Sequence, residues 1–187
     1  IGLPTTIVAA GTDLKTAQYV QSVFANSYFR VYTNPDIEGV ELCGALKNVI
    51  ALAAGVSDGI GYGDNAKAAI ITRGMAEIAR LGKAMGCDER TFYGLAGIGD
   101  LIVTATSRHS RNNRAGNLMG RGFSAKEAIE QVGMVVEGIN ALPAAVGLSQ
   151  KYDVEMPITF AVNEMVHHGA DPKTAVSLLM TREYKAE

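Results

Sequence analysis

The stretch Leu42-Cys-Gly-Ala-Leu-Lys-Asn-Val-Ile-Ala-Leu-Ala-Ala54 decides the fold class, because nearly every residue in it is apolar or small. An uninterrupted run of this length is typical of a buried helix rather than of a strand. Asn34-Pro35 upstream is a typical helix opening, since the fixed φ of Pro suits the first helical turn. Downstream, the glycines of Asp58–Gly63 interrupt the pattern. We therefore expect one long helix from about Asp36 to Val56.

The chain beyond this helix has the pattern of further helices. Asp64 is the expected N-cap of a second long helix, which runs through Ala84 and stops at Gly86. Other helix starts are expected where capping or first-turn chemistry occurs: Asp88, Ser110, Ser124 with Glu127 at capping-box spacing, Val136, Met156-Pro157 and Asp171-Pro172. No convincing strand pattern follows residue 36. The sequence thus predicts a mainly α, multi-helix domain.

The residues before the long helix have a strand–helix–strand pattern instead. Thr5–Ala10 is short and β-branched, and Phe29–Thr33 alternates like a second strand. Asp13 is the expected cap of the helix between them, which should reach about Asn26. The side chains expected to be buried on this helix are Leu14, Ala17, Val20, Val23 and Phe24.

Two strands do not form a stable sheet by themselves. Residues 1–33 are therefore expected to be the trailing edge of an α/β domain, and residues 34–187 a helical domain of their own. The chain also starts at Ile1 without an initiator Met. We expect it to be a fragment of a longer protein.

Composition and charge argue against several classes of protein. The chain has 187 residues, 48% hydrophobic and 19% charged, which is typical of a globular protein. Its net charge of −2 argues against a nucleic-acid partner, and no apolar run approaches the roughly 20 residues of a membrane span. Cys43 and Cys87 lack metal or redox spacing, so we expect buried thiols in a reducing compartment, no metal site and a cytoplasmic protein.

Lys47 and Asp100 are charged residues in unusually apolar surroundings. An ammonium among the small apolar neighbours of Lys47 is costly to desolvate, and such a group suits a proton donor or acceptor. Asp100 follows Gly99 in a glycine-flanked apolar stretch, and within a helix it would share a face with Thr104. The alternatives are a lysine that extends along an exposed stripe to solvent and an Asp100 that only caps a helix.

The third candidate cluster is Arg108-His-Ser-Arg-Asn-Asn-Arg114, in which Ser110-Arg111-Asn112 is the expected opening of a helix. A helix that starts here offers backbone N–H groups, a hydroxyl, an amide and a forked guanidinium, which together suit a phosphate group. A solvated basic loop is the alternative. Gly59–Gly63, by contrast, follows a helix and lacks the spacing of a nucleotide-binding fingerprint. We interpret it as a helix–helix turn that brings two helices close together.

Five segments resemble, in order, those of bacterial-type NAD(P)-dependent glycerol-3-phosphate dehydrogenases. They are Gly39–Ala51 with Lys47, Gly61–Gly74, Gly97–Thr104, Ser107–Asn112 and Val135–Gly138. The resemblance covers essentially the whole chain. It implies a C-terminal, substrate-binding domain of the 6-phosphogluconate dehydrogenase-like type, preceded by a β-α-β remnant of a Rossmann-type nucleotide-binding domain. The glycine fingerprint and second substrate lysine of that family have no counterpart in this chain.

The resemblance also implies roles for individual residues. Lys47 would be the general acid and base. The substrate contacts implied with Lys47 are Asp100, Thr104, Ser110, Arg111 and Asn112, and the cofactor contacts are Arg111, Val135 and Glu137. NAD or NADP would be bound mostly by the missing domain. The implied reaction interconverts dihydroxyacetone phosphate and sn-glycerol 3-phosphate for phospholipid synthesis, and the chain alone is expected to be inactive.

Two other functions stay open from the sequence. A β-hydroxyacid dehydrogenase would share the helical-domain lysine, but it does not need the Ser110-Arg111-Asn112 cluster. A non-catalytic helical dimerisation module would explain why no nucleotide fingerprint is present, but it does not require Lys47, Asp100 or Arg111. A homodimer is compatible with each of these functions.

Overall fold

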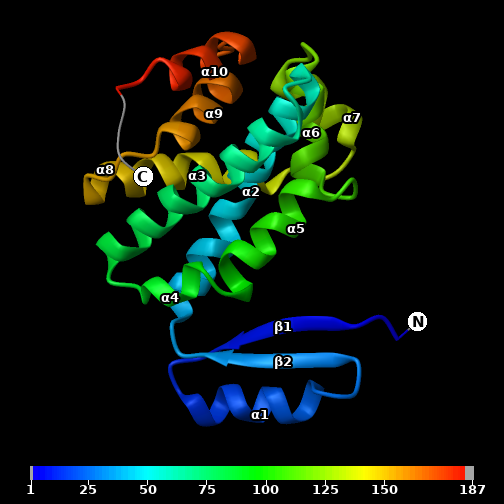
Figure 1. Ribbon diagram of the computed structural model, residues 1–187, viewed down its shortest axis with the longest axis vertical. Helices are drawn as coiled ribbons and strands as arrows, with labels where there is room; N and C mark the ends of the chain where they lie inside the picture. Colours follow the sequence, from blue (N-terminus) through cyan, green and yellow to red (C-terminus); the bar gives the residue numbers. More distant parts are fainter. Residues whose placement is uncertain (1, 184–187) are drawn as a thin grey trace.

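The structure is a computed structural model that describes residues 2–183 (Figure 1). Its N-terminal end is formed by two parallel strands and one helix. β1 (Thr5–Ala10) pairs in parallel with β2 (Phe29–Asn34) along its whole length, and α1 (Leu14–Phe24) connects the two. Asp13 caps α1 as expected, since its carboxylate accepts hydrogen bonds from two backbone N–H groups of the first turn. β2 continues one residue beyond the expected end of the strand.

The apolar stripe expected to be buried on α1 is mostly exposed. Ala17 is buried, but Leu14, Val23 and Phe24 are 50%, 56% and 57% exposed. The sheet on which α1 packs has two strands in the described part of the chain. This small surface covers only part of the apolar face of the helix.

α2 (Ile37–Ile60) is the central helix of the molecule, and the other helices surround it (Figure 1). They are α3 (Gly63–Met85), α4 (Glu89–Phe92), the π-helical turn η1 (Leu95–Gly99), α5 (Asp100–Thr106), α6 (Arg111–Gly120), α7 (Ala125–Val132), α8 (Glu137–Tyr152), α9 (Pro157–His167) and α10 (Pro172–Met180). Every residue from Asn48 to Ser57 is buried. The prediction of a mainly α domain is confirmed, since the described residues after β2 form helices and the turns between them.

Two helix ends differ from the sequence prediction. α2 continues past Val56 and ends before Gly61, which adopts a left-handed φ of 89°. α3 begins at Gly63, so Asp64 lies in its first turn and is not its N-cap. The caps predicted elsewhere are confirmed by side-chain hydrogen bonds at Asp88, Ser110, Asp171 and the Ser124–Glu127 capping box.

α2 alone among the helices of residues 2–183 is long and apolar enough to cross a membrane, although no such run was expected from the sequence. The most apolar window of α2 is 72% buried inside the protein, as in the core helix of a soluble domain. The helices that pack on it are mainly α3, α5, α6 and α8. The apolar character of α2 therefore matches its place at the centre of a helical core.

Glycines let α2 and α6 approach each other closely. Gly55 and Gly59 of α2 and Gly116 and Gly120 of α6 are each spaced by four residues, which places each pair on one helix face. A Cβ at Gly116 would lie 2.0 Å from the carbonyl oxygen of Leu52, and one at the other three positions would also meet backbone atoms of the facing helix. This contact fixes the position of α6 relative to the middle of α2.

A buried carboxylate from α3 caps the start of α9. Met156, at the N-cap of α9, makes no side-chain capping bond. Glu77 of α3, 2% exposed, instead accepts hydrogen bonds from the backbone N–H groups of Ile158 (2.7 Å) and Thr159 (3.2 Å) and from the Thr159 hydroxyl (3.1 Å). Burial raises the pKa of Glu77, and these hydrogen bonds offset part of that shift.

Hydrogen bonds at the end of β2 fix the strand–helix–strand unit to the helical body. The Asp36 carboxylate accepts from the Thr91 hydroxyl (2.7 Å) and from the backbone N–H of Asp88 (3.0 Å). The Asn34 amide donates to the same Thr91 hydroxyl at 3.3 Å. Figure 1 shows the unit at one end of the molecule, with β1 on the side of the helical body and α1 away from it.

Candidate functional site

Lys47 and Asp100, far apart in the sequence, are directly paired in the structure. The Lys47 ammonium donates to the carboxylate of Asp100, and the two side chains are 21% and 42% exposed. α5 has no side-chain capping bond, so the alternative that Asp100 serves as a helix cap is wrong. The alternative of a lysine pointing freely to solvent is wrong too, because Lys47 is mostly buried and bound. The pair therefore places the ammonium of Lys47, a candidate proton donor, at a partly exposed surface of α2.

The π-helical turn η1 brings Asp100 to Lys47. Gly97 within this turn has a non-helical conformation, with φ −94° and ψ −105°. A Cβ at Gly97 would lie 2.1 Å from the carbonyl oxygen of Phe92, so a larger residue does not fit. The Thr104 hydroxyl donates to the backbone carbonyl of Asp100 at 2.7 Å, which leaves its oxygen free to accept a hydrogen bond. Thr104 and Asp100 thus share a face of α5, as the sequence predicts.

Ser110, Arg111 and Asn112 form the N-terminal turn of α6. The Ser110 hydroxyl accepts from the backbone N–H of Asn113 at 3.2 Å and keeps its own proton for a further acceptor. The first two N–H groups of the helix, those of Arg111 and Asn112, have no partner within the helix by helix geometry. Arg111 is half-buried, and its guanidinium lies 3.6 Å from a carboxylate oxygen of Glu137. The alternative of a solvated loop is wrong for these three residues.

A buried hydrogen-bond network connects this turn to the lysine helix. Asn112, 5% exposed, donates from its amide to the Oδ1 of Asn48 at 2.8 Å and accepts from the backbone N–H of Gly138 at 2.8 Å. Asn48, next to Lys47 in α2, donates in turn to the Glu137 carboxylate at 3.3 Å. The first turns of α6 and α8 therefore meet at Asn48, one residue from Lys47.

An apolar segment borders the same cluster. Met134 and Val135 precede α8 and are 57% and 59% exposed, while Val136 is buried. Glu137 follows them and pairs with Arg111. An exposed apolar surface beside a guanidinium–carboxylate pair suits a ligand that has an apolar ring and polar substituents.

A family model described as NAD-dependent glycerol-3-phosphate dehydrogenase C-terminus matches residues 36–177. The chain belongs to this family. The match starts at the N-cap of α2 and includes every residue of the site described above. The resemblance noted from the sequence is confirmed at the level of the family.

Curated relatives and solved structures agree with this placement. The chain is 65% identical over 185 residues to glycerol-3-phosphate dehydrogenase (NAD(P)+) 2 of Lactobacillus delbrueckii subsp. bulgaricus, covering 99% of the chain and 55% of that protein. It is 60% identical over 179 residues to glycerol-3-phosphate dehydrogenase (NAD(P)+) of Bacillus subtilis, covering 96% of the chain and 52% of that protein. The chain therefore spans about half the length of the curated relatives that it matches.

The similarity extends to three dimensions. A crystal structure of the glycerol-3-phosphate dehydrogenase of Coxiella burnetii matches with a TM-score of 0.93 at 42% identity, over 97% of this chain and 56% of the other. The glycerol-3-phosphate dehydrogenase of Saccharomyces cerevisiae matches with a TM-score of 0.75 at 30% identity, over 87% of this chain and 48% of the other.

Two polar features of this domain were missed in the sequence analysis. Asn48 was assigned no role, although an amide in an otherwise apolar helix is a signal for a buried partner. The ion pair between Asp58 of α2 and Lys67 of α3, with 2.8 Å between nitrogen and oxygen, was also missed. Its members lie nine residues apart in the sequence, on either side of the predicted helix–helix turn, but that pattern did not indicate which side chains would pair across it.

The cysteines and the acidic residues complete the description of the site. Cys43 lies one helical turn before Lys47, and burial raises the pKa of its thiol to about 12, which makes it a poor nucleophile. It is buried as expected, whereas Cys87 is only half-buried. Within residues 2–183, no three His, Cys, Asp or Glu side chains gather in a way that could hold a metal ion.

Proposed function

We propose that the chain is the substrate-binding half of an NAD(P)-dependent glycerol-3-phosphate dehydrogenase that interconverts dihydroxyacetone phosphate and sn-glycerol 3-phosphate. One observation carries the proposal: Lys47, paired with Asp100, lies one residue from the network that joins α2 to the Ser110-Arg111-Asn112 turn. A proton donor and an anion-binding helix start are thus combined in one cluster. The names of the relatives support this substrate and this class of cofactor.

Lys47 is proposed to move the proton at the reacting oxygen. In the direction of ketone reduction, its ammonium donates a proton to the oxygen as that oxygen becomes an alkoxide. In the reverse direction, the neutral amine accepts the hydroxyl proton. Asp100 holds the ammonium in place through its carboxylate. The side chain of Asp100 is partly exposed, so its carboxylate can also accept hydrogen bonds from substrate hydroxyls. Thr104, on the same face of α5, offers a hydroxyl oxygen as a further acceptor.

The start of α6 is proposed to hold the phosphate of the substrate. The hydroxyl proton of Ser110, the N–H groups of the first turn and the guanidinium of Arg111 are all donors to phosphate oxygens. The amide of Asn112 has one N–H left after its bond to Asn48, and it would act from the same turn. The positive end of the helix dipole adds to the attraction.

Arg111, Val135 and Glu137 fit a nicotinamide cofactor. Val135 is exposed and apolar, which suits contact with the nicotinamide ring, and Arg111 with Glu137 offers both donors and acceptors beside it. When bound, the cofactor supplies the hydride. The proposed role of this chain is to cover the nicotinamide ring and to exclude water from the reacting carbon.

The strand–helix–strand unit is proposed to belong to the nucleotide-binding domain of the longer protein, with residues 34–187 as the substrate domain. The exposed apolar face of α1 and the two-stranded sheet support this, since both suit packing against further strands and helices. On this proposal the 187-residue chain has no dehydrogenase activity, because most cofactor contacts lie outside it. Cytoplasmic placement, a role in phospholipid synthesis and a homodimer are further proposals of the same kind.

The proposal is tested with the longer protein, by measuring reduction of dihydroxyacetone phosphate with NADH and with NADPH. Lys47→Ala should lower kcat by roughly 10²–10⁴-fold, the range for a positioned acid and base. Lys83→Ala, on the exposed C-terminal turn of α3, is the matched control and should leave kcat unchanged. A longer protein that reduces a β-ketoacid faster than dihydroxyacetone phosphate would refute the proposed substrate, and an unchanged kcat in Lys47→Ala would refute the role of Lys47.

A further inference from the structure

A polar cavity of about 530 Å³ lies on a different face of α6 from the site described above. It is formed where the ends of α2, α3 and α5 meet α6 and α7. The residues that line it are Asp58, Lys67, Thr106, Arg108, Asn113, Arg114, Asn117, Leu118 and Gln131. All but Leu118 carry polar side chains, which argues against a site for an apolar ligand.

The cavity has a positive charge although the chain as a whole is negative. Asp58 is already neutralised, because it pairs with Lys67 at 2.8 Å and also accepts from the Asn113 amide at 3.4 Å. Arg108 and Arg114 are exposed, and neither has an ion-pair partner among the described residues 2–183. One carboxylate against one ammonium and two guanidinium groups leaves a local charge of +2. The net charge of the chain is −2.

We infer that this cavity binds the dianion of a small phosphate monoester. Two unpaired guanidinium groups match the charge and the fork geometry of a phosphate group. The volume lies within the range of about 300–1,000 Å³ typical of small-molecule sites and exceeds what a phosphate ion alone would fill. Thr106, Asn117 and Gln131 supply a hydroxyl and amides for the hydroxyl groups of the esterified part.

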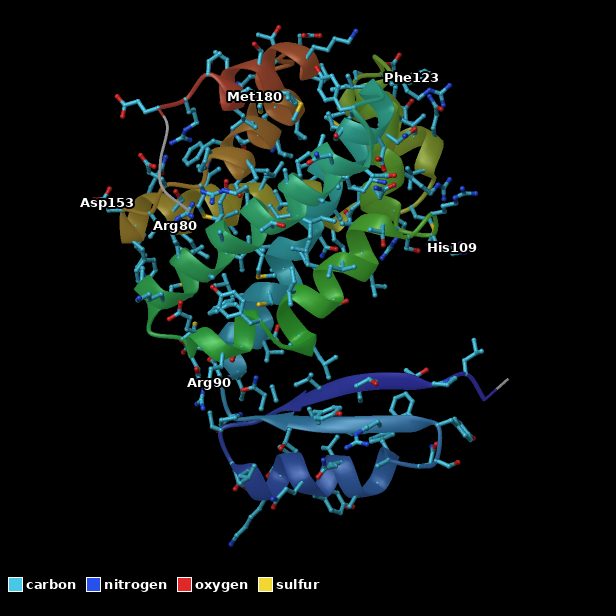
Figure 2. All side chains as sticks on the ribbon, viewed as in Figure 1. Arg80, Arg90, His109, Phe123, Asp153 and Met180 are labelled. Carbon is cyan, nitrogen blue, oxygen red and sulfur yellow. The ribbon has the colours of Figure 1, made fainter. Side chains whose placement is uncertain are left out.

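This second site is separate from the proposed catalytic cluster but shares a helix with it. Arg111 and Asn112 face Glu137 and Asn48, on α8 and α2. Arg114 and Asn117, three and six residues after Arg111, line the cavity. Arg108 precedes His109, which Figure 2 shows on the outer surface of the loop between α5 and α6. Binding at the cavity can therefore be followed separately from binding at the catalytic cluster.

The test uses the 187-residue chain and two probes, inorganic phosphate and glycerol 2-phosphate, an ester that is not the proposed substrate. Binding is followed by ¹H–¹⁵N NMR through the side-chain amides of Asn117 and Gln131 for the cavity, and through the backbone N–H of Gly138 for the catalytic cluster. We expect saturable shifts of both side-chain amides, with tighter binding of the ester than of phosphate.

The double variant Arg108→Gln/Arg114→Gln should weaken binding at the cavity at least tenfold, since hydrogen bonds to charged groups are worth roughly a factor of ten or more each. Arg121→Gln, which removes an exposed guanidinium at the other end of α6, should bind as the wild type does. Arg111→Gln should leave the cavity shifts unchanged and reduce only that of Gly138.

Three results would overturn the inference. The first is an absence of saturable shifts at Asn117 and Gln131. The second is an equal loss in Arg121→Gln, which would indicate only general electrostatic attraction. The third is loss of the cavity shifts in Arg111→Gln, which would mean that the probes bind at the catalytic cluster alone.

Discussion

Replacing Asn112 with Ala tests whether the start of α6 is held in place by the buried network. The Asn112 amide uses its oxygen for the backbone N–H of Gly138 and one of its N–H groups for Asn48. Alanine fits the helix at this position but makes neither bond. The substitution therefore leaves the Oδ1 of Asn48 and the N–H of Gly138 without their partner.

The magnitude follows from the burial of these two groups. Asn48 is 6% exposed and Gly138 is buried, so solvent has little access to either. An unsatisfied buried donor or acceptor costs about 1–3 kcal/mol, which gives a loss of about 2–6 kcal/mol in the free energy of unfolding for the two. Domains of this size have about 5–15 kcal/mol in total. Asn112→Ala should thus remove a substantial part of the stability.

The assay is urea unfolding followed by circular dichroism at 222 nm. Asn117→Ala is the matched control, because Asn117 lies on the same helix and its side chain makes no hydrogen bond within residues 2–183. The control should change the free energy of unfolding by less than about 0.5 kcal/mol, as is usual for such positions. Equal stabilities of the two variants would refute the reasoning, because the network would then contribute nothing.

Three further predictions follow from other contacts. Glu77→Gln should remove a pH dependence: burial raises the pKa of Glu77 above its ordinary value of 4.5, so its contribution to stability is fully present below that value and is lost as pH rises through the raised pKa. Urea titrations from pH 4.5 to 8 should therefore show wild type losing stability relative to Glu77→Gln, and a constant difference would contradict this. Gly116→Ala should cost about 1–3 kcal/mol or more through its clash with α2, whereas Gly147→Ala, where a Cβ has open space, should raise stability by about 0.4–1 kcal/mol in the same urea unfolding assay. In the longer protein, Asp100→Asn should reduce kcat while shifting stability by no more than about 1 kcal/mol, because the pair with Lys47 is partly exposed; a large loss of stability with normal kcat would make Asp100 a structural residue.

The elements predictable from the sequence are those with local causes. The apolar run around Lys47 predicted the central helix, and the side chains of Asp88, Ser110 and Ser124 predicted helix starts, because a cap acts within one helical turn. The sequence prediction placed the end of α2 too early, at about Val56, because it too relied on local propensity. Ser57, Asp58 and Gly59 are poor helix residues, but Ser57 is buried and Gly59 allows contact with α6, so packing extends the helix to Ile60.

Contacts between distant residues could not be predicted in this way. Four glycines let the backbones of α2 and α6 meet, although locally each indicates only a low helix propensity. They are Gly55, Gly59, Gly116 and Gly120. In the cap of α9, Glu77 binds two residues that follow it by 81 and 82 positions in the sequence. The exposed stripe of α1 was expected to be buried because the sequence pattern indicates an apolar face without indicating how much surface covers it.

Asn112 illustrates why a site assigned by resemblance needs the structure. The resemblance implies contact with the substrate, but one N–H and the oxygen of its amide are already bonded inside the protein, to Asn48 and Gly138. The free N–H groups at the start of α6 are oriented only if that turn is held against α2 and α8, and Asn112 provides this attachment. The close approach of α8 to α2 at Gly138 leaves room for it, since a Cβ at Gly138 would lie 2.5 Å from the carbonyl oxygen of Asn48 and 3.1 Å from the amide oxygen of Asn112. We therefore expect Asn112 to be required first for the geometry of the proposed phosphate site, so that its loss should affect substrate binding and stability together, whereas loss of Arg111 should affect binding alone.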